Sequence, residues 1–308
     1  MARAARLYYL EGQPQSQIAK SLDVSAPSVS RLLTRARDEN LIQFTIAEPY
    51  ASCLDLELEL ADAFGLAEVL VAPNVNDDPA ATKKAVAMEA ARLVQRVTTP
   101  EDIIGLAWGG TMYHLIHYLN PCRRVDASFV TMHGSISCCG PELDAANLVH
   151  RIAMAFGGHQ FTIEADGLQD SVDEAGAISS SPDVAAVERF YERITFSISG
   201  VGSLYPQLGS RLVNSTYLTP SEINELTAAG AYGDLVLRFF DYDGNECDTS
   251  MRDRTLSITF DQYRQIPHRL VAAYGPQKAE TVRAALRGNL LNVLVVDEGL
   301  ARQLLQLA

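Results

Sequence analysis

The chain has 308 residues, of which 47% are hydrophobic and 20% charged, and its formal net charge is −13 at pH 7. This composition excludes a disordered protein, and the length allows one large domain or a small domain followed by a large one. No apolar run approaches about 18 residues, so we expect neither a membrane-spanning helix nor a membrane partner. The cysteines are Cys53, Cys122, Cys138, Cys139 and Cys247. Their odd number and wide scatter argue against a disulfide framework and favour the reducing cytoplasm.

The charge is unevenly distributed along the chain. Residues 1–46 contain six basic and four acidic side chains, whereas the remainder contains 19 basic and 34 acidic ones. Only the first segment, with its net charge of +2, can lie comfortably against a polyanion such as nucleic acid.

The first forty residues predict three short helices. The first spans about Ala2 to Glu11 and ends at the helix breaker Gly12-Gln13-Pro14. The second buries Ile18, Ala19 and Leu22, and the third buries Val29, Leu32, Leu33 and Ala36, which follow the helical spacing i, i+3, i+4, i+7. This arrangement is typical of a helix-turn-helix unit.

The corner between the second and third helices carries three informative residues. Ser25 is a favourable N-cap for the third helix. Asp23 stands where such motifs usually have glycine, and aspartate tolerates the left-handed conformation better than most residues. We expect Val24 to fill the angle between the two helices.

The outer face of the third helix carries short hydroxyls and arginines. Such side chains near the start of a recognition helix suit base edges and phosphates in a major groove. The predicted DNA-binding residues are Ser25, Pro27, Ser28, Arg31, Thr34 and Arg35. We therefore predict that residues 1–50 form an all-α helix-turn-helix domain that binds operator DNA; the alternative is a small helical bundle with a solvated polar face.

After a short apolar stretch at Leu41–Ile46 and a linker at Glu48-Pro49-Tyr50, the chain predicts a helix at Leu54–Phe64. Strands and helices then alternate. The predicted strands are Val69–Ala72, Ile103–Trp108, Ser128–His133, His159–Ala165, Ile194–Gly200, Leu235–Phe240, Arg269–Tyr274 and Asn292–Val296. The predicted helices are Thr82–Val97, Thr111–Leu119, Asp144–Phe156, Pro182–Glu192, Gln277–Leu286 and Gly299–Leu307. This alternation predicts a large, doubly wound, mostly parallel α/β domain over residues 51–308.

Three glycine-containing turns each follow a predicted strand and precede a helix or loop. They are Gly109-Gly110-Thr111, Gly200-Val201-Gly202-Ser203, and Gly275 with Lys278 one turn into the next helix. Ligands of parallel sheets bind at this edge, where glycine lets backbone N–H groups approach an anion. Neither a P-loop nor a dinucleotide fingerprint is present. The turns therefore predict either a small anionic or hydroxylated ligand, or tight turns alone.

Four stretches, "GLAWGGT", "SGVGS", "GAYGDLVLRFFDYDG" and "AAYGPQKAETVRAALRGNLLNVLVVDEGLARQLL", resemble the SorC family of bacterial transcriptional regulators. The resemblance implies a helix-turn-helix joined to a sugar-binding domain related to ribose-5-phosphate isomerase and glucosamine-6-phosphate deaminase. It also implies a homo-oligomer, dimeric or tetrameric, whose effector is usually a phosphorylated sugar.

The resemblance also assigns residues to the effector. Gly109, Gly110 and Thr111 would cradle the phosphate, Asp234 would accept sugar hydroxyls, and Lys278 would meet the phosphate or a ring oxygen. The remaining predicted effector residues are His133, Gly200, Gly202 and Gly275. His133 follows a strand at a position where arginine is expected in the family, and "TIEADG" departs from the expected apolar, proline-containing stretch. Since these departures leave fewer cations, an unphosphorylated polyol is the alternative effector.

The rival interpretation is a sugar-phosphate isomerase or deaminase. General acid–base catalysis would need a carboxylate or histidine beside the substrate, and Asp234, Asp166, Glu164 and His133 are candidates. An enzyme has no use for a groove-reading helix, so we predict a regulator with no catalytic residues and no cofactor. His114 and His117 lie three residues apart without a further ligand at a matching spacing, so we predict no metal site.

Overall fold

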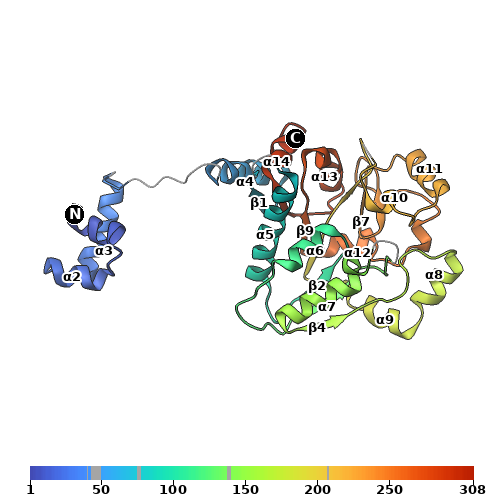
Figure 1. The fold of residues 1–308 in the computed structure, drawn as a ribbon, viewed down its shortest axis with the longest axis horizontal. Coiled ribbons are helices and arrows are strands. Elements are labelled where there is room, and N and C mark those ends of the chain that lie inside the picture. Colours follow the sequence, from blue (N-terminus) through green and yellow to red (C-terminus); the bar gives the residue numbers. More distant parts are fainter. Residues whose placement is uncertain (40, 43–49, 75–77, 137–139, 207) are drawn as a thin grey trace. The chain divides into compact units, whose positions relative to one another are not determined.

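The computed structural model describes residues 1–39, 41–42, 50–74, 78–136, 140–206 and 208–308. The chain divides into two compact units, Met1–Ala51 and Ser52–Ala308 (Figure 1). Most of the apolar stretch predicted at 41–46, the first two linker residues at 48–49, and the adjacent cysteines at 138–139 lie outside the described residues. Among the residues described, no helix is both long enough and apolar enough to cross a membrane.

The amino-terminal unit is a cluster of short helices, as predicted. Its elements are α1 (Ala2–Ala5), the π-helical turn η1 (Arg6–Leu10), α2 (Gln15–Leu22) and α3 (Ala26–Asp38). Its core consists of the buried side chains Ala4, Ala5, Ile18, Ala19, Val29, Leu33 and Ala36. Five of these residues, in α2 and α3, are positions that the helical spacing selects, because only one face of each short helix can be removed from water. Leu22 and Leu32, which were also predicted to be buried, are only partly buried at the edge of this core.

The corner between α2 and α3 confirms two predictions and corrects a third. Asp23 adopts the left-handed conformation with φ 53° and ψ 50°. Ser25 caps α3, since its hydroxyl oxygen accepts a hydrogen bond from the Ser28 backbone N–H at 3.3 Å. Val24 is 39% exposed, so the prediction that it fills the angle is wrong. The fully buried Ile18 and Val29 belong to the core of this unit instead.

The larger unit is built on a seven-stranded sheet in which every pair is parallel. The strand order is β1-β10-β9-β5-β2-β3-β4. The strands are β1 (Glu68–Ala72), β2 (Ile103–Leu106), β3 (Ser128–Thr131), β4 (His159–Phe161), β5 (Phe196–Ser199), β9 (His268–Ala272) and β10 (Val293–Asp297). Each overlaps a predicted strand. In the inner part of the sheet this is because a strand buried on both faces is a nearly continuous apolar run, whereas the edge strand β4 exposes His159 and Gln160.

Helices cover both faces of this sheet, as a doubly wound fold requires. The helices after the amino-terminal unit are α4 (Tyr50–Phe64), α5 (Pro79–Val97), α6 (Gly110–His117), α7 (Ala145–Phe156), α8 (Val172–Ser179), α9 (Pro182–Glu188), α10 (Arg211–Asn214), α11 (Pro220–Ala228), α12 (Phe260–Gln265), α13 (Ala279–Arg287) and α14 (Glu298–Leu305). The 3-10 turns are η3 (Pro141–Leu143), η4 (Tyr191–Arg193), η5 (Arg252–Arg254) and η6 (Pro276–Lys278). One core cluster joins α5, α6 and α7 to the sheet, and a second joins α4, α9, α12, α13 and α14 to it. The sequence did not predict α8, α10, α11 or α12.

A second, antiparallel sheet of three strands carries part of the site. Its strands are β6 (Gly202–Ser203), β7 (Gly233–Leu235) and β8 (Arg238–Phe240). The prediction of one strand over 235–240 is therefore wrong, because the chain reverses between β7 and β8. The turn residues Val236 and Leu237 have φ angles of 48° and 66°. Such turns usually carry glycine or asparagine, so nothing in this part of the sequence indicates the reversal.

Candidate functional site

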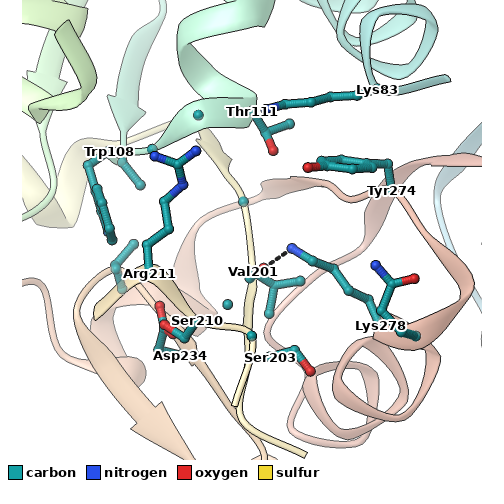
Figure 2. A pocket seen from close by; sticks show the side chains of 18 of the residues that line it. Lys83, Trp108, Thr111, Val201, Ser203, Ser210, Arg211, Asp234, Tyr274 and Lys278 are labelled. Atoms are coloured by element: carbon teal, nitrogen blue, oxygen red, sulfur yellow. Dashed lines mark hydrogen bonds between the residues drawn. The ribbon is translucent and has the colours of Figure 1, made fainter. Parts of the chain in front are cut away.

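Three neighbouring strands end at one edge of the sheet and enclose a cavity of about 280 Å³. The strands β2, β5 and β9 are adjacent and parallel, so the segments after them meet. Figure 2 shows the side chains that converge there. Seven of the nine predicted effector residues line the cavity: Gly109, Gly110, Thr111, Gly200, Gly202, Asp234 and Lys278.

The first wall of the cavity is the amino terminus of α6. Gly109 is its N-cap, with φ 118°, and the Gly109 N–H donates to the Leu143 carbonyl at 3.0 Å. Gly110 and Thr111 open the helix, where the first N–H groups have no partner within the helix and the dipole favours an anion. A side chain at Gly110 would meet Arg211 Nη2 at 3.4 Å and Lys83 Nζ at 3.5 Å. Two cations therefore flank this helix terminus.

Lys83 and Arg211 are functional candidates that the sequence did not predict. Lys83 comes from the first turns of α5, and Arg211 begins α10 (Figure 2). Burial lowers the pKa of Lys83, and the positive charge of Arg211 lowers it further. One signal for Lys83 was available: α5 follows β1, so a cation in its first turns lies at the same sheet edge as the glycine turns. Arg211 begins a four-residue helix that follows an irregular segment, and it has no comparable signal.

Lys278 forms the side of the cavity opposite Arg211 (Figure 2). Its Nζ donates a hydrogen bond to the Val201 carbonyl at 2.6 Å. Burial lowers the pKa of Lys278 to about 8, while the Asp234 carboxylate acts in the opposite direction. The amine is therefore mostly protonated at pH 7 and has further N–H donors for a ligand.

Asp234 is the acidic group of the cavity. It is only 4% exposed, and one carboxylate oxygen accepts a hydrogen bond from the Ser210 hydroxyl. Burial raises the pKa of Asp234 to about 6, against the opposing effects of Ser210 and Lys278. Gly202 lies opposite Asp234 on β6, and any side chain at Gly202 would overlap this carboxylate. Glycine at 202 thus makes room for the acid.

His133 does not line the cavity, which corrects its prediction as an effector contact. Its ring is fully buried; Nε2 accepts from the Trp108 backbone N–H at 3.1 Å, and Nδ1 is 2.7 Å from the Gly134 carbonyl, to which it donates. Burial lowers the pKa of His133 to about 4, so the ring is neutral near pH 7. His133 fixes the backbone that carries Trp108, which does line the cavity.

Gly275 also lies outside the cavity lining, although its neighbours Tyr274 and Gln277 are part of it. The Gly275 N–H donates to Asp297 Oδ1 at 2.5 Å, so it is not available to an anion. Its φ of 92° explains the glycine: it makes the sharp turn that brings Lys278 to the cavity.

The rival acid–base candidates are not assembled. Among Asp166, Glu164, His133 and Asp234, only Asp234 lines the cavity. Within the described part of the chain, no three histidine, cysteine, aspartate or glutamate side chains are placed to hold a metal ion.

The predicted DNA-binding residues lie on one face of α3. Val29, Leu33 and Ala36 are buried on the inner side of this helix. The outer side carries Ser25, Pro27, Ser28, Arg31, Thr34 and Arg35, of which all but the half-buried Ser28 are exposed. Arg31 Nε is 3.4 Å from the Pro27 carbonyl, and Arg35 pairs with Glu39 one turn later. The two arginines therefore stay on the surface of the helix, where their remaining N–H groups face solvent.

Known proteins resemble this chain over nearly its whole length. The family described as "Putative sugar-binding domain" matches residues 48–306. The deoxyribonucleoside regulator of Bacillus subtilis is 27% identical over 301 residues, covering 98% of this chain and 95% of that protein. The transcriptional regulator LsrR of an Enterobacter species is 29% identical, covering 100% of this chain and 93% of that protein.

Solved structures give the same result. The full-length sorbitol operon regulator SorC of Klebsiella pneumoniae superposes with a TM-score of 0.80 at 28% identity, covering 98% of this chain and 97% of that one. These relatives regulate transcription, which supports the regulator over the isomerase or deaminase alternative. The chain belongs to the putative sugar-binding domain family and is a transcriptional regulator of the SorC family.

Proposed function

We propose that this regulator binds operator DNA through residues 1–50 and is controlled by a small phosphorylated sugar or polyol bound in the cavity of residues 51–308. The names of three relatives, the sorbitol operon regulator, the deoxyribonucleoside regulator and the erythritol catabolism regulatory protein EryD of Brucella abortus, refer to small polyhydroxylated compounds. They support an effector of this chemical class.

The observation that supports a phosphate group on the effector is a group of three cations in the cavity. Lys83, Arg211 and Lys278 line the cavity, and within the described residues none of them forms an ion pair. Three cations without an ion pair, beside a single carboxylate, are costly to gather, all the more at a helix amino terminus. They are favourable once an anion accepts charge-assisted hydrogen bonds from them. In a chain of net charge −13, such a local excess of positive charge points to a phosphate.

The other end of the cavity suits hydroxyl groups. Asp234, Ser203 and Ser210 line it. The Asp234 carboxylate accepts from Ser210 and keeps further acceptor capacity for ligand hydroxyls, while the serine hydroxyls, already bonded within the protein, add polar surface. Trp108 adds an aromatic wall, which can cover the carbon skeleton of a sugar (Figure 2). The ligand would thus lie with its phosphate at Gly110, Thr111 and the cations, and its hydroxyls toward Asp234.

We further propose that the regulator acts as a dimer or tetramer. A single three-helix reader buries too little surface for tight specific binding, so paired half-sites are the usual solution. Light scattering at micromolar concentration, with and without DNA, tests this; a monomer under both conditions would contradict it.

A thermal-shift screen tests the effector class. It compares matched pairs: sorbitol, erythritol, ribose and deoxyribose, each with and without a terminal phosphate. A ligand that binds only the folded state raises its stability, by about 2.7 kcal/mol at a hundredfold excess over Kd. We expect at least one phosphorylated member to raise Tm while its unphosphorylated counterpart does not. Stabilisation by free sugars or polyols alone would overturn the phosphate assignment.

A further inference from the structure

Tyr274 has an unusual place among the cavity residues, because its ring lies beside two of the three cations. Lys83 Nζ is 5.5 Å and Lys278 Nζ 5.9 Å from the ring centroid. The two lysines come from distant parts of the chain, α5 and η6, and Figure 2 shows the tyrosine ring between their side chains. Tyr274 itself follows β9 and lines the cavity.

A neighbour that attracts cations stabilises the Lys83 and Lys278 amines at the cavity. Lys83 and Arg211 each lower the pKa of Lys278, so the cations repel one another before any ligand arrives. Asp234 counteracts this repulsion at Lys278, but it is not among the causes that act on Lys83. The face of an aromatic ring carries partial negative charge and attracts a cation within about 6 Å. A ring face at these distances attracts both amines without adding a formal negative charge that would repel the ligand.

We propose that Tyr274 is a positioning residue that holds Lys83 and Lys278 in place for the phosphate of the effector, and that it acts through its ring face rather than through its hydroxyl. The inference rests on the proposed function, since it assumes an anionic ligand in this cavity. A carboxylate in place of Tyr274 would neutralise the lysines, and an aliphatic residue would leave the Lys83 amine without an attractive neighbour and Lys278 with only its hydrogen bond to the Val201 carbonyl. The aromatic ring avoids both outcomes.

The test uses the full chain and inorganic phosphate as the probe, with binding measured by calorimetry at low ionic strength. Tyr274→Leu removes the ring face, whereas Tyr274→Phe keeps it and removes only the hydroxyl. We expect Tyr274→Leu to weaken phosphate binding by about five- to thirtyfold, the range for a partly desolvated cation–π contact, and Tyr274→Phe to restore near wild-type affinity. The matched control is Tyr242→Leu, because Tyr242 stacks under Arg287 at 4.0 Å outside the cavity. This control should bind phosphate like the wild type.

A double-mutant cycle separates positioning from a direct contact. If Tyr274 acts through Lys83, Tyr274→Leu should cost less in a Lys83→Gln background than in the wild type. Equal costs in both backgrounds would overturn the proposal, as would Tyr274→Phe binding as weakly as Tyr274→Leu. Thermal unfolding checks that each variant is folded, and Tyr274→Met, which preserves apolar volume, replaces the leucine variant if that one unfolds.

The outcomes also separate this inference from the proposed function. Wild-type protein that does not bind phosphate would overturn both the phosphorylated effector and the role of Tyr274. Wild-type binding that Tyr274→Leu leaves unchanged would overturn the role of Tyr274 alone.

Discussion

Gly202 and Asp234 lie opposite each other on the antiparallel strands β6 and β7, and the Asp234 carboxylate occupies the space that a side chain at position 202 would need. The sequence alone offers Gly202 as one of several turn glycines. In the structure, the absence of a side chain at Gly202 leaves the space through which the buried Asp234 carboxylate reaches the cavity from the second sheet.

Gly202→Ala should therefore impair effector binding. The added methyl group forces the carboxylate away from Ser210 and the cavity, and we expect a loss of about 1.5–3 kcal/mol, the range for a hydrogen bond to a charged group. Calorimetry with the sugar phosphate found in the thermal-shift screen measures it. Gly176→Ala is the control, because Gly176 lies in α8 with no atom within 4 Å of the added methyl group. That variant should gain about 0.5–1 kcal/mol of stability and keep its affinity, since alanine favours a helix interior. Unchanged affinity in Gly202→Ala would contradict the role of Asp234.

Lys278→Met should weaken effector binding without unfolding the protein. The variant keeps most of the side-chain volume but loses the charge-assisted contact, at a cost of about 1.5–3 kcal/mol of binding free energy. Calorimetry on folded protein decides: equal affinity in the variant and the wild type would mean that Lys278 only anchors its turn to the Val201 carbonyl.

The affinity for a phosphorylated effector should fall as the pH rises above about 8. The lowered pKa of Lys278, about 8 against its usual 10.5, means that the free protein loses this charge in that range. Phosphate binding favours the protonated amine, so binding near pH 8 should take up a proton, which calorimetry in buffers of different ionisation enthalpy detects. Lys278→Met should reduce this alkaline decline to the part that Lys83 contributes, since burial lowers the pKa of Lys83 as well. The affinity measured near pH 6 is less informative, because Asp234 and a phosphate monoester both titrate there.

The free energy of unfolding of the ligand-free protein should rise, rather than fall, as the pH increases above about 8. Below pH 8 the amine is charged in both the folded and the unfolded state, and the cost of burying it is fully present. Between about pH 8 and 10.5 the folded state releases the proton first, so the Lys278 contribution stabilises folding as the pH rises. Urea unfolding across this range, compared with Lys278→Met, measures that contribution; a decrease specific to the wild type would contradict the lowered pKa.

Replacement of Arg31 and Arg35 by alanine should weaken operator binding. Both side chains lie on the exposed face of α3, opposite Val29 and Leu33. Arg31→Ala alone should cost about 1–3 kcal/mol if Arg31 reads a base. Fluorescence anisotropy on DNA obtained by binding-site selection measures the loss. Arg302→Ala, which removes an exposed arginine of α14, should not change the affinity. The same affinity in the Arg31→Ala, Arg35→Ala double variant as in the wild type would disprove the assigned DNA-binding face.

The sequence predicted the parallel sheet well, because strands that are buried on both faces form nearly continuous apolar runs. Runs such as 69–72 and 293–296 are apolar throughout and are flanked by helices with clear periodicity. The β7–β8 hairpin has no comparable sequence pattern. Its turn is made by Val236 and Leu237, two residues that seldom adopt positive φ, and the Ser257 hydroxyl donates to the Val236 carbonyl at 2.5 Å. Contacts from distant residues hold this turn, and a local pattern cannot reveal them.

The site was predictable only in part for the same reason. The glycine turns and Lys278 follow strands directly, so the topology of a parallel sheet brings them together. Arg211 reaches the cavity from a four-residue helix after an irregular segment, and its position depends on tertiary packing. His133 follows a strand as the other candidates do, but its ring is fully buried and accepts a hydrogen bond from the Trp108 backbone N–H. Sequence position does not distinguish a side chain that faces the cavity from one that supports it.

The most direct test of the account is the operator affinity of the full chain, measured by fluorescence anisotropy with and without the phosphorylated sugar that raises Tm. We predict that the phosphorylated compound changes this affinity by about five- to 150-fold, the usual range for allosteric coupling. We also predict that its unphosphorylated counterpart changes nothing and that Lys278→Met reduces the response to the phosphorylated one. An operator affinity that is the same with and without saturating sugar phosphate would contradict the claim that the cavity controls DNA binding.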